Sequence, residues 1–250
     1  MLSKNKIKYI KSLELKKNRK QDKVFVVEGH KSVDELLDSF SCKIIVATSE
    51  WLQKHKNLKA QEIIEVSDEE LAKVSFLKTP QNVLAVFDQP NYDLDFSTPQ
   101  KELCLALDDV QDPGNLGTII RVADWFGIEN IYCSQGTADL YNPKTVQATM
   151  GAISRVKVHY CDLPSFISSL NDVKVYGTFL DGENLYDSPI SENGLIVMGN
   201  EGNGISKEVE KLVNSKLLIP NFPSGRATSE SLNVAMATGI ICAEFRRRIK

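Results

Sequence analysis

The chain has 250 residues, of which 42% are hydrophobic and 25% are charged. This length suits one large domain or two modest ones, and the composition is that of an ordinary globular protein. No apolar run reaches the roughly 18 residues expected of a membrane span. The N-terminal stretch has charge but lacks the apolar core of a secretory signal.

The net charge of −3 hides basic ends. Residues 1–23 contain nine Lys or Arg against two acids, and the chain closes on Arg246, Arg247, Arg248 and Lys250. Such ends either contact a polyanion or form ordinary solvated helix faces, and the charge pattern alone leaves both interpretations open.

Neither the five cysteines nor the three histidines form a cluster typical of a metal site. The cysteines lie far apart, and no C-x-x-C pair occurs, which argues against a zinc knuckle and against a disulfide framework. We therefore expect no metal, free thiols that mostly pack in the core, and a reducing, cytoplasmic location.

The first 90 or so residues predict a small α/β unit. Strands are expected at residues 23–29, 42–48, 62–66 and 82–88, and helices at residues 30–40 and 67–76. Ser67 is the expected cap of the second helix, with acids in its first turn. Residues 89–100 (QPNYDLDFSTPQ) contain two prolines and no periodicity, which is typical of a linker. We place domains at 1–92 and 101–250, with a linker at 93–100.

The second unit alternates strands and helices more regularly. Strands rich in Val, Ile and Leu are predicted at residues 102–110, 130–134, 155–160, 174–180, 194–200 and 216–220. Helices are predicted at residues 116–126, 142–150, 163–170, 206–213 and 231–248. The alternation predicts an α/β fold with a mainly parallel sheet and helices on both faces. Ligands bind beyond the carboxyl ends of such strands, so three loops after strands deserve inspection.

The first loop is DDVQDPGNLG, followed by an apolar helix face. Residues 112–115 have the chemistry of a tight turn, and Gly127 is expected to end the helix. Asn115 stands at the helix entrance, and Arg121 follows six residues later. Arg121 is either a solvated surface residue or a cation aimed into a cleft.

The second loop is GNEGNGIS, residues 199–206. Ile205 occupies the lysine position of a phosphate-binding loop, and the glycines run G-x-x-G-x-G, so the Walker and dinucleotide motifs both fail. What remains is a glycine-rich bend that either lets backbone groups approach a flat ligand or merely turns sharply. Glu201 is its charged side chain, and Ser206 is the expected cap of the next helix.

The third loop follows the strand that Pro220 ends. Ser231 and Asn233 stand at the entrance of the last, very apolar helix. Both residue types are typical of helix caps, and helix entrances also offer free N–H groups to a ligand. Capping and ligand binding both remain open from these residues alone.

Together these motifs resemble the three signature motifs of the SpoU family, RNA ribose 2′-O-methyltransferases of the SPOUT superfamily. They are N-x-G-x-x-x-R at 115–121, G-N-E-G-x-G at 199–204, and I-P at 219–220 followed by S-L-N-V-A at 231–235. The resemblance covers about residues 100–248. KVFVVEGHKSVDELL, residues 23–37, also looks like the opening of the family's substrate-binding domain, an α/β module akin to ribosomal RNA-binding proteins.

The resemblance implies S-adenosylmethionine as cofactor, a homodimer with its active site near the subunit interface, and a C-terminal trefoil knot. Physical priors disfavour knots, so the knot depends on the resemblance alone. The main chains of Gly199, Ile219 and Leu232 are the implied contacts for adenine and ribose. The full set of implied cofactor-binding residues is Gly199, Asn200, Gly202, Ile219, Pro220, Ser231 and Leu232.

The implied catalytic residues are Asn115, Arg121, Glu201, Ser231 and Asn233. Family mechanisms give the motif arginine a central role, sometimes as general base. We prefer a cation that binds the target phosphate or stabilises the developing alkoxide, because the pKa of arginine lies above about 12. Asn115, Ser231 and Asn233 would orient the hydroxyl and the arginine. Glu201 would fix the loops and pair with Arg121.

The implied substrate is structured RNA. Ribosomal RNA is preferred over transfer RNA, because a separate recognition module suits a large structured substrate. The alternative is a non-catalytic, ribosome-associated RNA-binding protein, which would not need the five catalytic residues. Residues 221–230 form a longer loop than the family's compact one, and Arg226 there either reaches RNA or belongs to a flap.

Overall fold

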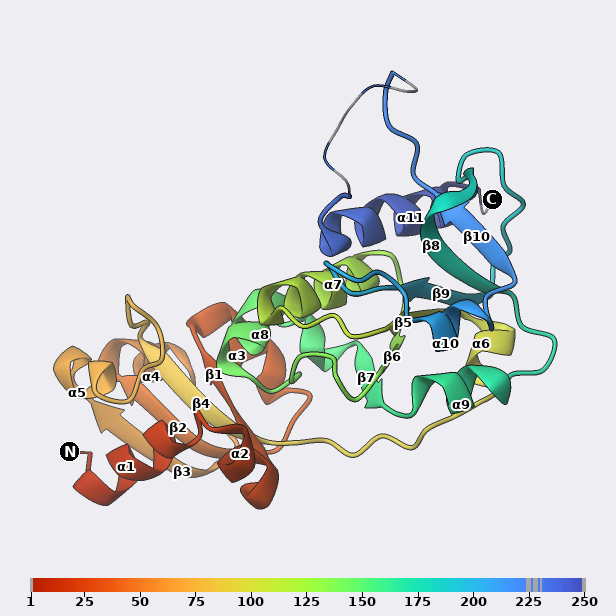
Figure 1. Ribbon diagram of the computed structural model, residues 1–250. Coiled ribbons are helices and arrows are strands. Elements are labelled where there is room, and N and C mark those ends of the chain that lie inside the picture. Colours follow the sequence, from red (N-terminus) through yellow and green to blue (C-terminus); the bar gives the residue numbers. More distant parts are fainter. Residues whose placement is uncertain (1, 224–225, 227–228, 230, 249–250) are drawn as a thin grey trace. The chain divides into compact units, whose positions relative to one another are not determined.

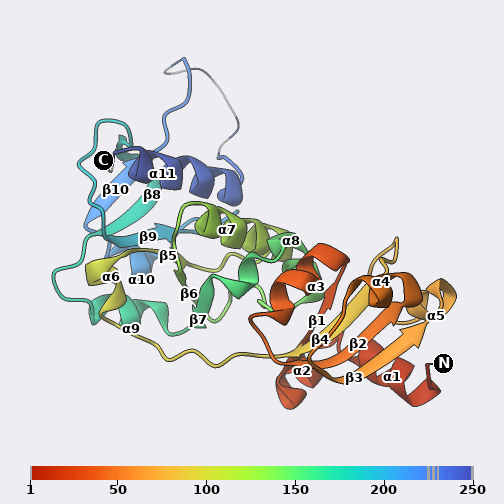
Figure 2. The same ribbon diagram turned by 180° about the vertical axis from the view of Figure 1, so that it is seen from behind.

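The structure is a computed structural model that describes residues 2–223, 226, 229 and 231–248. Its internal contacts divide the chain into two compact units (Figures 1 and 2). Unit 1 comprises residues 1–91 and 139–154, and unit 2 comprises residues 92–138 and 155–250. The segment 139–154, assigned above to the second domain, thus packs with unit 1. In the described part of the chain, no helix is both long and apolar enough to span a bilayer.

Unit 1 is built on a four-stranded mixed sheet in the order β1-β4-β2-β3. The strands are β1 (Val24–Glu28), β2 (Cys42–Thr48), β3 (Ala60–Val66) and β4 (Val83–Asp88). Strand β4 runs antiparallel to β1 and β2, whereas β2 and β3 are parallel. The helices are α1 (Lys4–Ser12), α2 (Lys16–Asp22), α3 (His30–Leu37), α4 (Ser49–Lys54), α5 (Asp68–Ala72) and α8 (Pro143–Thr149), with the 3₁₀ turn η1 (Ala152–Ser154). The small N-terminal α/β unit expected from the sequence is confirmed.

Two short N-terminal helices were not predicted from the sequence. Ile10 and Leu13 are fully buried against the sheet, so α1 covers one of its faces. Arg19 of α2 is only 2% exposed and donates to the carbonyl oxygens of Leu13 (2.7 Å) and Glu14 (2.6 Å). Its guanidinium also pairs with Asp139 at 2.5 Å. Arg19 is therefore a structural residue and not part of a solvated basic face.

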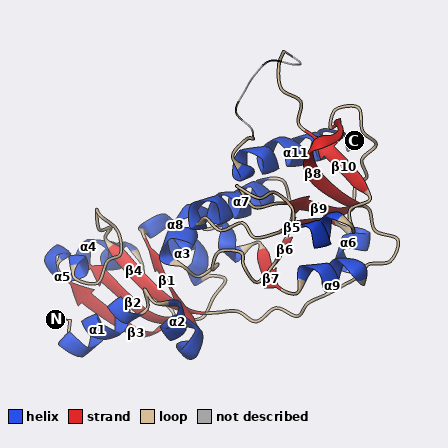
Figure 3. Cartoon of the chain, viewed as in Figure 1, coloured by secondary structure: helices blue, strands red, loops and turns tan. Residues whose placement is uncertain are grey.

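Unit 2 contains a six-stranded sheet in the order β10-β8-β9-β5-β6-β7, and all its strand pairs are parallel (Figure 3). The strands are β5 (Leu103–Leu107), β6 (Asn130–Cys133), β7 (Lys157–Tyr160), β8 (Val175–Asn184), β9 (Gly194–Met198) and β10 (Ser215–Leu218). The helices are α6 (Thr98–Lys101), α7 (Pro113–Trp125), α9 (Leu163–Ser168), α10 (Lys207–Glu210) and α11 (Val234–Arg248). Helix α6 falls partly inside the predicted linker.

Helices cover both faces of this sheet, as expected. Cys104, Ala106 and Val197 pack with residues of α9 and α10 in one apolar cluster. Side chains alternate along a strand, so the intervening residues face the opposite side. There Tyr176 of β8 meets Phe245 of α11 edge-on, with ring centroids 4.9 Å apart.

Helices α7 and α11 lie side by side (Figures 1 and 2). The guanidinium of Arg246 donates to the carbonyl oxygens of Phe126 (2.7 Å) and Gly127 (2.9 Å). Arg248 donates to three carbonyl oxygens of residues 185–188. These two C-terminal arginines anchor the last helix within unit 2.

Candidate active site

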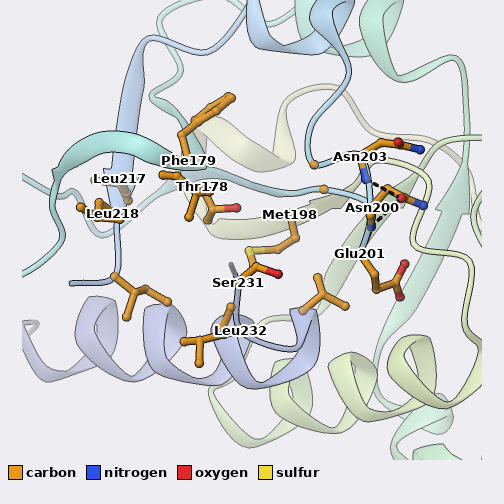
Figure 4. Close-up of a pocket in the computed structure, with 17 residues that line it drawn as sticks. Thr178, Phe179, Met198, Asn200, Glu201, Asn203, Leu217, Leu218, Ser231 and Leu232 are labelled. Carbon is orange, nitrogen blue, oxygen red and sulfur yellow. Dashed lines mark hydrogen bonds between the residues drawn. The ribbon is translucent and has the colours of Figure 1, made fainter. Parts of the chain in front are cut away.

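A cleft of about 410 Å³ opens at the carboxyl ends of β9 and β10 (Figure 4). Its volume falls in the range of small-molecule sites, roughly 300–1,000 Å³. Four segments far apart in the sequence line it: Thr178–Leu180 of β8, Met198–Gly204 after β9, Leu217–Ile219 of and after β10, and Ser231, Leu232, Val234 and Ala237 at the start of α11. The second and third loops singled out from the sequence thus meet at one site.

The glycine bend is held by Asn200. Its backbone N–H and C=O exchange hydrogen bonds with Gly204, both at 2.9 Å. Its side-chain oxygen accepts from the N–H groups of Gly202 (2.9 Å) and Asn203 (3.0 Å), and its side-chain nitrogen donates to the carbonyl of Asp109 (2.7 Å). The Asn200 side chain is thus engaged within the loops, so a ligand would meet the main chain of this bend.

Gly199 has no room for a side chain. A Cβ at this position would lie 2.3 Å from the carbonyl carbon of Gly204 and 2.4 Å from the nitrogen of Ile205. These atoms are backbone and cannot rotate away. At Gly202, by contrast, the nearest atom to an added Cβ is Oδ1 of Asn200 at 3.6 Å, an ordinary contact. Of these two glycines, only Gly199 is thus required by space, while Gly204 is favoured by its positive φ of 68°.

A chain of side-chain hydrogen bonds joins the three signature loops. Nδ2 of Asn233 donates to Oδ1 of Asn115 at 3.0 Å, and Nδ2 of Asn115 donates to Oε1 of Glu201 at 2.8 Å. We call this chain the amide relay. It joins the entrance of α11, the first turn of α7 and the glycine bend.

The helix cap fixes the direction of the amide relay. Oδ1 of Asn233 accepts from the N–H groups of Ala235 (3.0 Å) and Met236 (3.3 Å), so Asn233 is the cap of α11. With its oxygen occupied, Asn233 presents its NH₂ group to Asn115. Asn115 then turns its own NH₂ group toward the carboxylate of Glu201. One residue therefore serves as helix cap and as part of the site.

The loop after β5 is tied to the loop after β9 by a second contact. The buried carboxylate of Asp108 accepts from the N–H of Ser206 at 2.7 Å, and Ser206 caps α10 as predicted. The predicted turn at residues 112–115 is wrong, because Asp112 is the cap of α7 and Pro113 is its first residue. Proline is favoured there because its missing N–H would have no partner in a first turn.

The main chain at the entrance of α11 is available to a ligand. Ser231 and Leu232 line the cleft, and neither forms a hydrogen bond with any described residue. Ser231 is therefore not the helix cap in this structure. Ile219 also lines the cleft, whereas Pro220 is not among the lining residues. The cleft thus offers free backbone groups and an apolar lining, a combination that suits a flat heterocycle joined to a sugar.

Arg121 does not line the cleft of its own chain. It is exposed on α7, roughly 9 Å further along the helix axis than Asn115. Within the part of the chain that the structure describes, its guanidinium forms no hydrogen bond or ion pair. The pairing with Glu201 suggested by the sequence is absent, since Glu201 accepts from Asn115 instead.

Several lining residues carried no sequence signal. Thr178, Phe179 and Leu180 of β8 belong to no recognised motif and reach the cleft because β8 lies between β9 and β10. The sheet order is what reveals them. The loop 221–230 lies partly outside the described residues. The main-chain N–H of Arg226 donates to the carbonyl of Pro223 at 3.1 Å.

No thiol supplies a nucleophile at neutral pH. Burial raises the pKa values of Cys42, Cys104 and Cys242 to about 12, and that of Cys161 to about 11 with help from Asp162. Burial also raises the pKa of Cys133. All five cysteines are free, and among the described residues no group of His, Cys, Asp or Glu could hold a metal ion.

The cleft is built from glycine-bend, strand-end and helix-entrance segments on a parallel sheet, and the family matches of the chain identify the class of protein. Residues 102–243 match the SpoU rRNA Methylase family, and residues 4–85 match the MRM3-like substrate binding domain. The chain belongs to the SpoU rRNA methylase family. The family and the enzyme class expected from the motifs are confirmed.

Similar proteins match along nearly the whole chain. The 23S rRNA (guanosine(2553)-2′-O)-methyltransferase RlmP of Bacillus subtilis is 34% identical, and the match covers 96% of both chains. A solved structure assigned to the TrmH family of RNA methyltransferases, from Porphyromonas gingivalis, is 41% identical with a TM-score of 0.86 and covers 99% of both chains. An AdoMet-bound rRNA methyltransferase from Sinorhizobium meliloti is 30% identical with a TM-score of 0.87, covering 100% of this chain and 97% of that one.

The two glycines give a matched test of the bend. We expect Gly199→Ala to lower the melting temperature, because the added Cβ would force the backbone at Gly204 to move. Gly202→Ala should leave the melting temperature nearly unchanged. Differential scanning calorimetry of both variants measures this. Equal melting temperatures for the two variants would show that the bend has more freedom than the structure indicates.

Proposed function

We propose that the protein transfers a methyl group from S-adenosylmethionine to a ribose 2′-hydroxyl in structured RNA, with ribosomal RNA as the preferred substrate. The amide relay carries this proposal, because it ties the first signature loop to the two signature loops that line the cleft. The alternative, a non-catalytic RNA-binding protein, gives no reason for these loops to be linked. Full-length similarity to a 23S rRNA 2′-O-methyltransferase supports the substrate class.

The cofactor would be held by the cleft between the glycine bend and the entrance of α11. Main-chain groups of Gly199, Ile219 and Leu232 are the proposed contacts for adenine and ribose. Asn200, Gly202, Pro220 and Ser231 complete the proposed set, with Pro220 shaping the strand end. S-adenosylmethionine supplies an activated methyl group, so the protein has only to position the substrate and favour loss of the hydroxyl proton.

Arg121 is the proposed cation of the reaction. A guanidinium stays protonated in proteins, so Arg121 suits stabilisation of the developing alkoxide or binding of the target phosphate better than proton abstraction. Asn115, Asn233 and Glu201 would hold the start of α7 in register with the cleft. Ser231, which lines the cleft without a partner among the described residues, is a proposed contact for the substrate hydroxyl.

The proposed active unit is a homodimer. Arg121 is exposed on α7. Two large apolar side chains are also exposed on the neighbouring helices α7 and α11: Trp125 of α7 (85% exposed) and Met236 of α11 (63% exposed). Large exposed apolar side chains on two neighbouring helices are compatible with a surface that a partner covers. A second copy seated on α7 and α11 would cover them and bring Arg121 close to a subunit interface, where the active site is expected.

The remaining assignments follow from family membership. We propose residues 1–92 as the RNA-binding domain, 93–100 as linker and 101–250 as the catalytic domain. We also propose that the segment after β10 forms a trefoil knot. Its support is that α11 returns from the edge strand to contact α7 and residues 185–188. Free thiols and an rRNA substrate support a cytoplasmic location.

Arg121→Ala tests the proposed reaction. We expect this variant to bind S-adenosylmethionine as the wild type does, because Arg121 lies outside the cleft. Methyl transfer to a 23S rRNA transcript should fall by roughly 100-fold, the usual loss when a group that stabilises transition-state charge is removed. Calorimetry measures binding, and transfer of a radiolabelled methyl group measures the rate.

Two outcomes would contradict the proposal. Wild-type protein that binds RNA but not S-adenosylmethionine would favour the non-catalytic alternative. Near-normal turnover by Arg121→Ala would remove the arginine from the mechanism while leaving the enzyme class intact.

The homodimer is tested by Trp125→Glu combined with Met236→Glu. Light scattering should give a dimer mass for the wild type and a monomer mass for the double variant, because the two charges would be buried in the proposed interface. Circular dichroism should be unchanged, since both side chains are exposed. A wild type that is monomeric at micromolar concentration would contradict the proposal.

A further inference from the structure

The first 23 residues carry a net positive charge, whereas the rest of the chain is net negative. These residues hold nine Lys or Arg and two acids. The whole chain has 30 basic and 33 acidic residues, so residues 24–250 hold 21 basic and 31 acidic ones. A polyanion such as RNA would therefore be repelled by the average surface of this protein and attracted to helices α1 and α2.

Five lysines of these helices, and Lys23 at the end of α2, are available to bind a partner. They are exposed, and none of their ammonium groups forms a hydrogen bond or ion pair within the described chain: Lys4, Lys8, Lys16, Lys17, Lys20 and Lys23. We call this set the lysine face. The remaining lysines of α1 differ, since Lys6 pairs with Glu62 at 2.5 Å and Lys11 donates to the carbonyl of Ser75 at 3.0 Å.

The spacing of the lysine face concentrates its charge. Lys4 and Lys8 are four residues apart on α1, as are Lys16 and Lys20 on α2, so each pair projects from one side of its helix. Like charges at this spacing destabilise a helix. The arrangement therefore costs some helix stability, and none of these four lysines forms an ion pair within the described chain that would offset the repulsion.

The lysine face stands on a rigid support. Helices α1 and α2 are joined by a hydrogen bond from the side-chain Nδ2 of Asn18 to the backbone carbonyl of Ser12 at 2.8 Å. Buried Arg19 fixes α2 to the turn before it and to Asp139. The two acids of the region leave the face largely uncompensated, because Asp22 is half-buried beside Tyr9 and only Glu14 is exposed.

We propose that the lysine face is the surface on which unit 1 docks the phosphate backbone of the RNA substrate. This proposal rests on the proposed function, and it assigns RNA affinity to two short helices at the start of the chain. Lysine binds phosphate as a point charge and reads no base sequence. The lysine face therefore contributes affinity and salt dependence, and it does not select the target nucleotide.

The test removes four charges from the lysine face and, in a matched control, four charges elsewhere in unit 1. The first variant combines Lys8→Gln, Lys16→Gln, Lys17→Gln and Lys20→Gln. The control combines Lys56→Gln, Lys59→Gln, Lys73→Gln and Lys78→Gln, which are exposed lysines of the same unit without an ion pair among the described residues. Lysine and glutamine have similar helix propensities, so both variants should fold.

Binding of a 23S rRNA transcript is measured by filter binding between about 50 and 300 mM salt, a range over which the affinity of phosphate contacts falls by orders of magnitude. For the first variant, we expect the affinity for RNA to fall by ~10-fold or more. The slope of log K against log salt should become shallower by about 3 to 4 units, about one unit per lysine removed. The control should keep the wild-type slope. In turnover, the first variant should raise KM for RNA and leave kcat and S-adenosylmethionine binding unchanged.

Each result bears on one claim. Equal losses in the two variants would show a general effect of net charge and overturn the lysine face. Wild-type affinity and slope in the first variant would overturn it as well. A wild-type protein that binds the transcript through the lysine face but transfers no methyl group would refute the proposed function and leave this inference standing.

Discussion

The hydrogen bonds from Asn233 through Asn115 to Glu201 are the contact on which the site depends. They connect α11, α7 and the glycine bend, and they join residues that are 118 positions (Asn233 and Asn115) and 86 positions (Asn115 and Glu201) apart in the chain. Each asparagine uses its oxygen and its nitrogen for different partners, so the amide relay has a defined direction. Asn233 is both the first residue of the amide relay and the cap of α11. A movement of the loops that displaces Asn233 would therefore also loosen the start of α11.

The parallel sheet makes this convergence possible. Across the sheet, β6 and β7 follow β5 on one side. Strands β9, β8 and β10 follow β5 on the other side. Loops after β5 and β9 therefore emerge side by side at the point where the strand order reverses, the usual position of ligand sites in such sheets. The contacts of Asp108 with Ser206 and of Asn200 with Asp109 fasten those two loops together.

Much of the fold was predictable because buried strands leave a clear apolar signal. The strands of both sheets were found, as were the caps at Ser67 and Ser206. Helices α1 and α2 were missed because they are only nine and seven residues long. The spacing of Ile7, Ile10 and Leu13, which pack on the sheet, was the signal that could have found α1. Motif spacing indicated which residues gather at the site. It could not show that Asn233 would cap α11 and Ser231 would not, since that choice depends on where Asn115 lies in space.

The most direct measurement of this account is the methyl-transfer rate of Asn233→Asp. Aspartate caps a helix as well as asparagine does, but it cannot donate to Asn115. We expect a melting temperature within about 2 °C of the wild type, which corresponds to less than ~1 kcal/mol in a chain of this size. The single-turnover rate on a 23S rRNA transcript should fall by ~10-fold or more. An unchanged melting temperature together with a wild-type rate would contradict a role for the amide relay in holding the site.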